Sequence, residues 1–258
     1  MSEQGFTPSW LDLREPADHA ARDKELLRLA TNHVGPGRVI LDLGSGTGST
    51  ARAFSDLLPD RAWRFVDGDE RLLAEAGARH PESERVLANL RELGSLPWSD
   101  VGLVTASALL DLMPSNWVLE LAGRVSEVGA PFYAALNYNG SMQWSPSVEG
   151  DKQITSFFNQ HQQTDKGLGP ALGPYASETA VDFFERHGFE LHVGDSPWSL
   201  TPHDEALQGE LIDGIASAAN DAGYNTPQDW LNSRRQVLGK TSLLVGHTDI
   251  LALPAPRN

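Results

Sequence analysis

Three glycines at every second position, Gly44, Gly46 and Gly48, lie between a short apolar run at 39–43 and a helical pattern at 51–58. This order predicts a strand, a tight turn and a helix. Glycine lets the backbone adopt positive φ and lets another molecule approach the main chain closely. Three such residues at a strand-to-helix junction therefore indicate a bound ligand.

The spacing of the glycines excludes two common nucleotide sites. A dinucleotide fingerprint has two residues between its second and third glycine, and this turn has one. A phosphate loop closes with Gly-Lys-Ser/Thr, which is absent here. The segment Leu-Asp-Leu-Gly-Ser-Gly-Thr-Gly at 41–48 instead resembles the first motif of the class I (Rossmann-like) S-adenosylmethionine (SAM)-dependent methyltransferases. The resemblance implies SAM as the cofactor, held by Asp42, Gly44, Ser45, Gly46 and Gly48.

The second predicted strand ends in an acid, Asp67, roughly twenty residues after the glycines, where a carboxylate can accept both ribose hydroxyls of a nucleoside. In the methyltransferase family this acid binds the SAM ribose. Asp67 aligns best because it directly follows the apolar strand, and Asp69 is the second choice, with Gly68 between them in the same expected site. The alternative is that both acids only cap the helix that begins near Glu70.

Two further segments resemble the family more loosely. Asn89 and Leu90 are similar to the corner that meets the adenine, and many relatives have Asp in place of Asn89. An amide oxygen can still accept a hydrogen bond from the adenine amino group. Ser107, at the end of the fourth strand, belongs to a segment similar to the one beneath the transferred methyl group. The resemblance covers residues 38–137.

Methyl transfer depends on alignment, and a base is needed only if the acceptor must lose a proton. His161 is a candidate base, because an unperturbed imidazole has a pKa of about 6.5. Asp111 and Tyr138 are candidates because they lie at strand ends close to the expected cofactor. Alternatively, His161 only forms hydrogen bonds within its own loop. The other histidines lack partners at metal-ligand spacing, and we expect no metal site.

The segment 38–137 alternates between strands and helices, which requires a parallel sheet covered on both faces. The expected strands are 39–43, 63–67, 85–88, 101–106 and 131–137, with helices at 47–58, 69–79 and 115–127. A helix at 176–187, a strand at 189–193, helices at 203–222 and 227–239 and a last strand at 241–252 follow. The prediction is an α/β fold with a doubly wound, seven-stranded, mostly parallel sheet whose last strand is antiparallel.

We expect one methyltransferase domain over residues 1–258. Its parts are an N-terminal helical segment (1–37), a SAM-binding core (38–137), two cap insertions (138–175 and 195–240) and a last strand with a tail (241–258). The first insertion is rich in Gly, Pro, Asn and Ser, and it predicts a lid or substrate loop with a short helix near 154–163. Both insertions follow strands whose carboxyl ends face the ligand.

The net charge of -15 and pI near 4.8 argue against nucleic acid or an anionic membrane as a partner. The chain has no cysteine, and its first residues lack the basic and apolar regions of a signal peptide. These features favour a soluble cytoplasmic protein with a small-molecule partner, and they leave its oligomeric state open.

The resemblance and these features predict transfer of a methyl group from SAM to a small-molecule acceptor, which leaves S-adenosylhomocysteine. Two alternatives stay open. One is an enzyme of the same fold that transfers an aminopropyl or carboxymethyl group. The other is a non-catalytic partner protein, although intact Gly44, Gly46, Gly48 and Asp67 disfavour it, because a scaffold does not need a strained turn.

Overall fold

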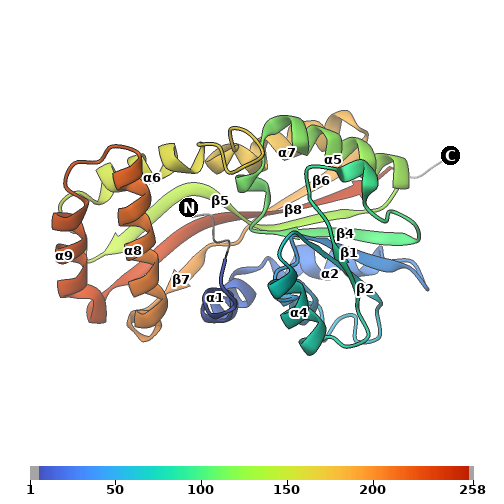
Figure 1. Cartoon of the computed structure of the whole chain (residues 1–258), viewed down its shortest axis with the longest axis horizontal. Helices are drawn as coiled ribbons and strands as arrows, with labels where there is room; N and C mark the ends of the chain where they lie inside the picture. The colour runs from blue at the N-terminus through green and yellow to red at the C-terminus, as the bar shows by residue number, and fades with distance from the viewer. Residues whose placement is uncertain (1–5, 256–258) are drawn as a thin grey trace.

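The computed structural model describes residues 6–255, and within this range eight strands form one mixed sheet (Figure 1). The order along the sheet is β3, β2, β1, β4, β5, β8 and β6, with β7 paired to β8. The strands are β1 Val39–Leu43, β2 Trp63–Asp67, β3 Glu84–Leu87, β4 Val101–Ser107, β5 Phe132–Ser145, β6 Phe189–Asp195, β7 Trp198–Leu200 and β8 Ser242–Pro254.

The five strands from β3 to β5 are parallel, and β8 is antiparallel to both β5 and β6. This arrangement confirms the predicted mostly parallel sheet with an antiparallel last strand. The structure has one strand more than predicted, and the additional strand is β7. Its three residues are too few to show a periodicity in the sequence.

Helices cover both faces of the sheet, as the buried, nearly continuous apolar strands require. The helices α5 and α7 pack on one face, where Phe132 and Phe184 stack with ring centroids 4.7 Å apart. The helices α2, α3 and α4 pack on the other face. Their bounds are α2 Lys24–Asn32, α3 Ser49–Ala53, α4 Glu70–Arg79, α5 Ser115–Val128 and α7 Ala176–Arg186. The helix after the glycine turn is shorter than the predicted 47–58.

The strands β5 and β8 continue past the sheet as a long antiparallel ribbon (Figure 1). The predicted strand ended at residue 137, and the predicted lid loop began there. The structure has strand to Ser145 and then helix α6 (Asp151–Gln162). Asn139, Ser141 and Gln143 lie on the exposed face of the ribbon, which gives this strand a loop-like composition.

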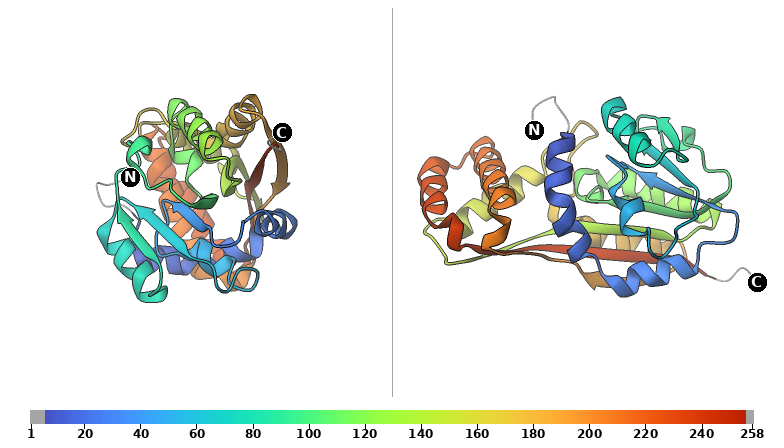
Figure 2. Two further views of the ribbon diagram at one scale, coloured as in Figure 1. Left: turned by 90° about the vertical axis from the view of Figure 1, so that its right-hand side faces the viewer. Right: turned by 90° about the horizontal axis from the view of Figure 1, so that it is seen from below.

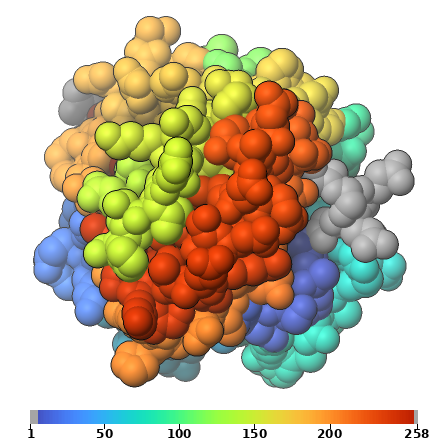
Figure 3. Space-filling view, turned by 90° about the vertical axis from the view of Figure 1, so that its left-hand side faces the viewer, coloured from blue at the N-terminus to red at the C-terminus, as the bar shows by residue number. Residues whose placement is uncertain are grey.

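The helices α6, α8 (Glu205–Asp221) and α9 (Pro227–Val237) pack on the inner face of this ribbon and form a cap with its own apolar core. Figure 3 shows that α8 and α9, in orange-red, close the end of the molecule beside the yellow-green ribbon. Arg234, 1% exposed, pairs with both carboxylate oxygens of Asp151 and lies over the Trp144 ring. Trp230 also donates to Asp151. The cap is therefore a packed unit.

The helix α1 (Pro8–Ala21) crosses between the core and the cap, at the end of the sheet where the central strands terminate (Figure 2). Glu15 forms an ion pair with Arg52 of the core. On the other side, Trp198 of β7 donates a 2.9 Å hydrogen bond to Asp18. Residues of α1 thus contact both parts of the molecule.

Across residues 6–255, no helix combines the length and apolar character needed to cross a bilayer.

Candidate active site

The glycine turn lies at the carboxyl end of β1, where the strand order reverses between β1 and β4, the usual ligand position in a doubly wound sheet. Gly44 and Gly46 have φ of 64° and 54°, which favours glycine. A Cβ on Gly46 would lie 3.1 Å from the Leu11 side chain. The turn is therefore tight and directly beneath α1.

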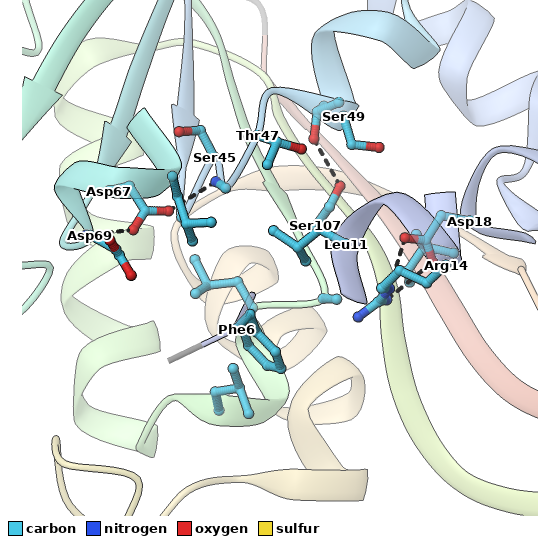
Figure 4. A pocket seen from close by; sticks show the side chains of 18 of the residues that line it. Phe6, Leu11, Arg14, Asp18, Ser45, Thr47, Ser49, Asp67, Asp69 and Ser107 are labelled. Carbon is cyan, nitrogen blue, oxygen red and sulfur yellow. Dashed lines mark hydrogen bonds and ion pairs between the residues drawn. The ribbon is translucent and has the colours of Figure 1, made fainter. Parts of the chain in front are cut away.

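Asp67, at the end of β2, forms a hydrogen bond with this turn (Figure 4). Its two carboxylate oxygens accept hydrogen bonds from the backbone amides of Gly46, at 2.8 Å, and Asp69, at 2.9 Å. Burial raises the pKa of Asp67. Asp69 is the N-cap of α4 and forms an ion pair with Arg71. Asp67 is thus the acid more available to a ligand.

A cavity of about 320 Å³ opens beside the turn (Figure 4). It brings together most of the predicted cofactor residues, namely Gly44, Ser45, Gly46, Asp67, Gly68, Asp69, Leu90 and Ser107. Three predicted residues, Asp42, Gly48 and Asn89, lie outside its wall. Gly48 is the N-cap of α3 and faces His80, and Asn89 accepts a hydrogen bond from the Arg91 amide within its own loop.

Asp42 lies buried below the turn, 1% exposed, and also outside the cavity wall. Thr105 donates a 2.7 Å hydrogen bond to one of its carboxylate oxygens, and the other has no partner among the described residues. Burial raises the pKa of Asp42 to about 7, against the opposing effects of Thr105 and the nearby Arg22.

Arg22 is a further residue of this cavity that the sequence motifs do not indicate. It follows α1, lines the cavity and is 3% exposed. One guanidinium nitrogen donates to Ser107 at 2.9 Å, and the other two have no partner within residues 6–255. A buried guanidinium with free donors favours an anionic group as its ligand.

A second cavity of about 440 Å³ adjoins the first. The two share wall residues Phe6, Arg14, Ala108, Leu112 and Leu136. The remaining wall is largely apolar and comes from α1, the ribbon, β7 and the cap, including Trp10, Met142, Phe158, Trp198, Leu211, Ile215 and Val245. The three predicted catalytic residues, Asp111, Tyr138 and His161, all line it.

The shared wall contains two non-glycine residues in the left-handed region, Ala108 with φ of 48° and Leu136 with φ of 58°. The amide of Leu136 donates a 2.8 Å hydrogen bond to Asp249, which is fully buried on β8. Tyr133 also donates to Asp249, at 2.8 Å. The surroundings thus hold a strained backbone where the two cavities meet, as is common at functional sites.

Asp111 and Tyr138 differ in the hydrogen bonds that their side chains form. Tyr138 donates a 2.8 Å hydrogen bond to Asn159, and burial raises its pKa. Asp111 is 9% exposed, and one of its carboxylate oxygens has no partner among the described residues. Burial raises the pKa of Asp111 to about 6.

His161 lies on α6 and is 8% exposed. The Lys166 ammonium is 3.3 Å from Nδ1 of His161 and donates to its backbone carbonyl at 2.7 Å. Burial and this ammonium lower the pKa of His161. Because Nδ1 accepts from Lys166, a neutral His161 carries its proton on Nε2, which is 3.9 Å from Asp221.

His247 of β8 is a further wall residue that no sequence motif indicates. It packs between Tyr138 and Trp198, and its Nδ1 has no partner in the described structure. Burial lowers its pKa to about 4, so it is neutral near pH 7. Its alternation with Leu243 and Val245 indicated a buried face of β8, but not the cavity that this face meets.

No protein-family model matches the chain, and no curated protein matches its sequence. Solved structures do share its fold. A cyclopropane synthase from Mycobacterium tuberculosis superposes with a TM-score of 0.52 at 15% identity, over 96% of this chain and 94% of that one. A Haemonchus contortus phosphoethanolamine N-methyltransferase in complex with SAM gives 0.52 at 16%, over 98% and 59%. The chain therefore has the Rossmann-like fold of the class I SAM-dependent methyltransferases.

Proposed function

We propose that the chain is a SAM-dependent methyltransferase that acts on a small molecule and leaves S-adenosylhomocysteine. The observation that carries this proposal is the pair of adjoining cavities. One is built on the glycine turn and Asp67, and the other is largely apolar and lined in part by the cap. An acceptor in the second cavity lies next to a cofactor in the first, whereas a scaffold protein would need neither.

The residues of the first cavity fit the polar groups of SAM. The free guanidinium donors of Arg22 match its carboxylate, and the carboxylate of Asp67 matches its ribose hydroxyls. Asp42, below the turn with an unpartnered oxygen, adds negative charge that suits its ammonium and sulfonium. The apolar side chains of Leu72 and Leu90 in the same wall suit its base.

Bound SAM would supply a methyl group on a positively charged sulfur atom. The protein's part is to align the acceptor, which the largely apolar wall of the second cavity would do. If the acceptor loses a proton, we assign the base role to Asp111. It has a free carboxylate oxygen, whereas His161 has its Nδ1 lone pair engaged by Lys166 and Tyr138 has a raised pKa.

Calorimetric titration with SAM and S-adenosylhomocysteine tests the cofactor. We expect the native protein to bind both, and Asp67→Ala to bind at least about ten-fold more weakly, because hydrogen bonds to a charged group contribute roughly 1.5–3 kcal/mol. Asp56→Asn is the control, since Asp56 is an exposed carboxylate outside the cavity.

Absence of SAM binding by the native protein would overturn the proposal. Unchanged binding by Asp67→Ala would remove Asp67 from the ribose role. Product analysis separates the transferred groups, because methylthioadenosine in place of S-adenosylhomocysteine would indicate aminopropyl transfer.

A further inference from the structure

The wall of the second cavity contains more carboxyl groups than guanidinium or ammonium groups among the described residues. Its acids are Asp111, which is buried, and Glu210, which is exposed at the edge. Its guanidinium, Arg14, is already bound by both oxygens of Asp18, at 2.9 and 3.1 Å, and lies 5.0 Å from the Trp198 ring centroid. Two of its three guanidinium nitrogens are thus engaged, and Asp18 offsets the charge of this one cation among the described residues of the wall.

The histidines do not change this balance. Burial lowers the pKa of both His161 and His247, so both are neutral near pH 7. The ammonium of Lys166 is outside the wall and donates to His161 and Thr164. Arg14 and Lys166 offset the charge of Asp111 only in part, because burial still raises the pKa of this carboxyl group to about 6. A carboxylate or phosphate in this cavity would therefore be repelled by Asp111.

Asp111 also has a defined position along the cavity. Its neighbour in the chain, Leu112, lines both cavities, as does Ala108 three residues earlier. Asp111 therefore belongs to the segment that lies where the second cavity meets the first. Its unpartnered oxygen, buried in an apolar wall, needs a hydrogen-bond donor.

We propose that the second cavity binds an apolar, uncharged hydroxyl compound, a phenol or an apolar alcohol, whose hydroxyl group donates a hydrogen bond to Asp111. This inference rests on the proposed function and specifies its acceptor. The aromatic side chains of Trp10, Phe158 and Trp198 contact the body of the molecule. The hydroxyl oxygen is then the atom held closest to the cofactor.

Three probes with one ring system test this proposal: 2-naphthol, 2-methoxynaphthalene and 2-naphthoate. Their binding is measured by calorimetry near neutral pH, with the full chain alone and saturated with S-adenosylhomocysteine. We expect 2-naphthol to bind about ten-fold more tightly than 2-methoxynaphthalene, which lacks the hydrogen-bond donor. We expect a difference of about ten-fold or more from 2-naphthoate, whose carboxylate is repelled by Asp111.

Two carboxyl variants complete the experiment. Asp111→Asn removes the charge and retains the shape, and it should reduce the preference for 2-naphthol over 2-naphthoate to about three-fold or less. Glu205→Gln removes an exposed carboxylate of α8 that lies outside both cavities, and it should leave the preference unchanged. The binding of 2-methoxynaphthalene by each variant reports whether its cavity is intact.

The inference is overturned if 2-naphthoate binds as tightly as 2-naphthol, if Asp111→Asn keeps the native preference, or if 2-naphthol does not bind. Loss of SAM binding is a separate result, because it contradicts the methyltransferase proposal. A protein that binds SAM but does not discriminate among the probes contradicts only the assignment of the acceptor.

Discussion

At the scale of single residues, the site contains carboxyl groups whose charged form is disfavoured by burial. Asp42 is fully enclosed, has one unpartnered oxygen and lies close enough to Asp67 for the two charges to repel. An ionised Asp42 therefore costs folding energy that the protein alone does not recover. A cationic ligand would compensate this cost, which is how a binding site gains affinity from a destabilising residue.

The Asp42→Asn variant separates stability from binding. The pKa of Asp42 is raised in the folded state, so its ionisation destabilises the fold as pH rises from about 4 through about 7, and the penalty is fully present at pH 8. Asn retains the oxygen that accepts from Thr105 and removes the charge. We expect a higher free energy of unfolding at pH 8, on the order of 2 kcal/mol, and weaker binding of SAM.

Denaturant unfolding at pH 5 and pH 8 measures this effect. The stability gained by Asp42→Asn must shrink toward pH 5, where native Asp42 is protonated. An equal gain at both pH values would show that the variant acts through packing and not through the charge.

At the scale of elements, the cap depends on one buried ion pair. Arg234 of α9 binds Asp151 of α6 and the carbonyl oxygen of Pro146, at 2.9 Å. Because α6 and α9 come from distant parts of the chain, this pair ties the two ends of the cap together. Removing one partner of a buried pair leaves an uncompensated charge, which costs about 3–5 kcal/mol.

We therefore expect Arg234→Met to lower the free energy of unfolding by about 3 kcal/mol or more in urea titrations. Arg235→Met is the matched control, because the adjacent Arg235 pairs with Asp213 on the surface and should contribute less than about 1 kcal/mol. Similar losses in the two variants would show that the buried pair has no special role in holding the cap.

The elements also show how far the sequence alone reaches. The glycine turn and Asp67 were predictable because their residue types follow from local geometry at strand ends. The length of β5 was not predictable, although the apolar residues Tyr138, Met142 and Trp144 lie on one face of it with Gly140 between the first two. Their partners on β8 lie about one hundred residues away, and such pairing leaves no local signal. Arg22 and His247 were missed for the same reason, because only tertiary packing brings them to the cavities.

At the scale of the whole molecule, the proposed cofactor site lies at the junction of the core and the cap. The helix α1 spans this junction, and Leu11, Arg14 and Asp18 all face the cofactor cavity (Figure 4). The overall charge of -15 attracts SAM, which carries a net positive charge, more than it attracts the neutral product. Because α1 lines this cavity, we expect it to take part in the binding of SAM and the release of S-adenosylhomocysteine.

Hydrogen exchange in the presence and absence of S-adenosylhomocysteine tests this arrangement. A ligand bound between the glycine turn and Arg22 should connect the two, and it should slow exchange at the amides of α1 and α2 as well as in the turn. The helix α9 is the internal control, since none of its residues lines the cofactor cavity and its exchange should not change. Protection confined to the turn and β2 would show that the core binds the cofactor without α1. Protection of α1 would instead make this helix part of the binding site. Trp198→Phe removes the hydrogen bond from β7 to Asp18 of α1, and it should then weaken cofactor binding several-fold without altering the exchange of the turn.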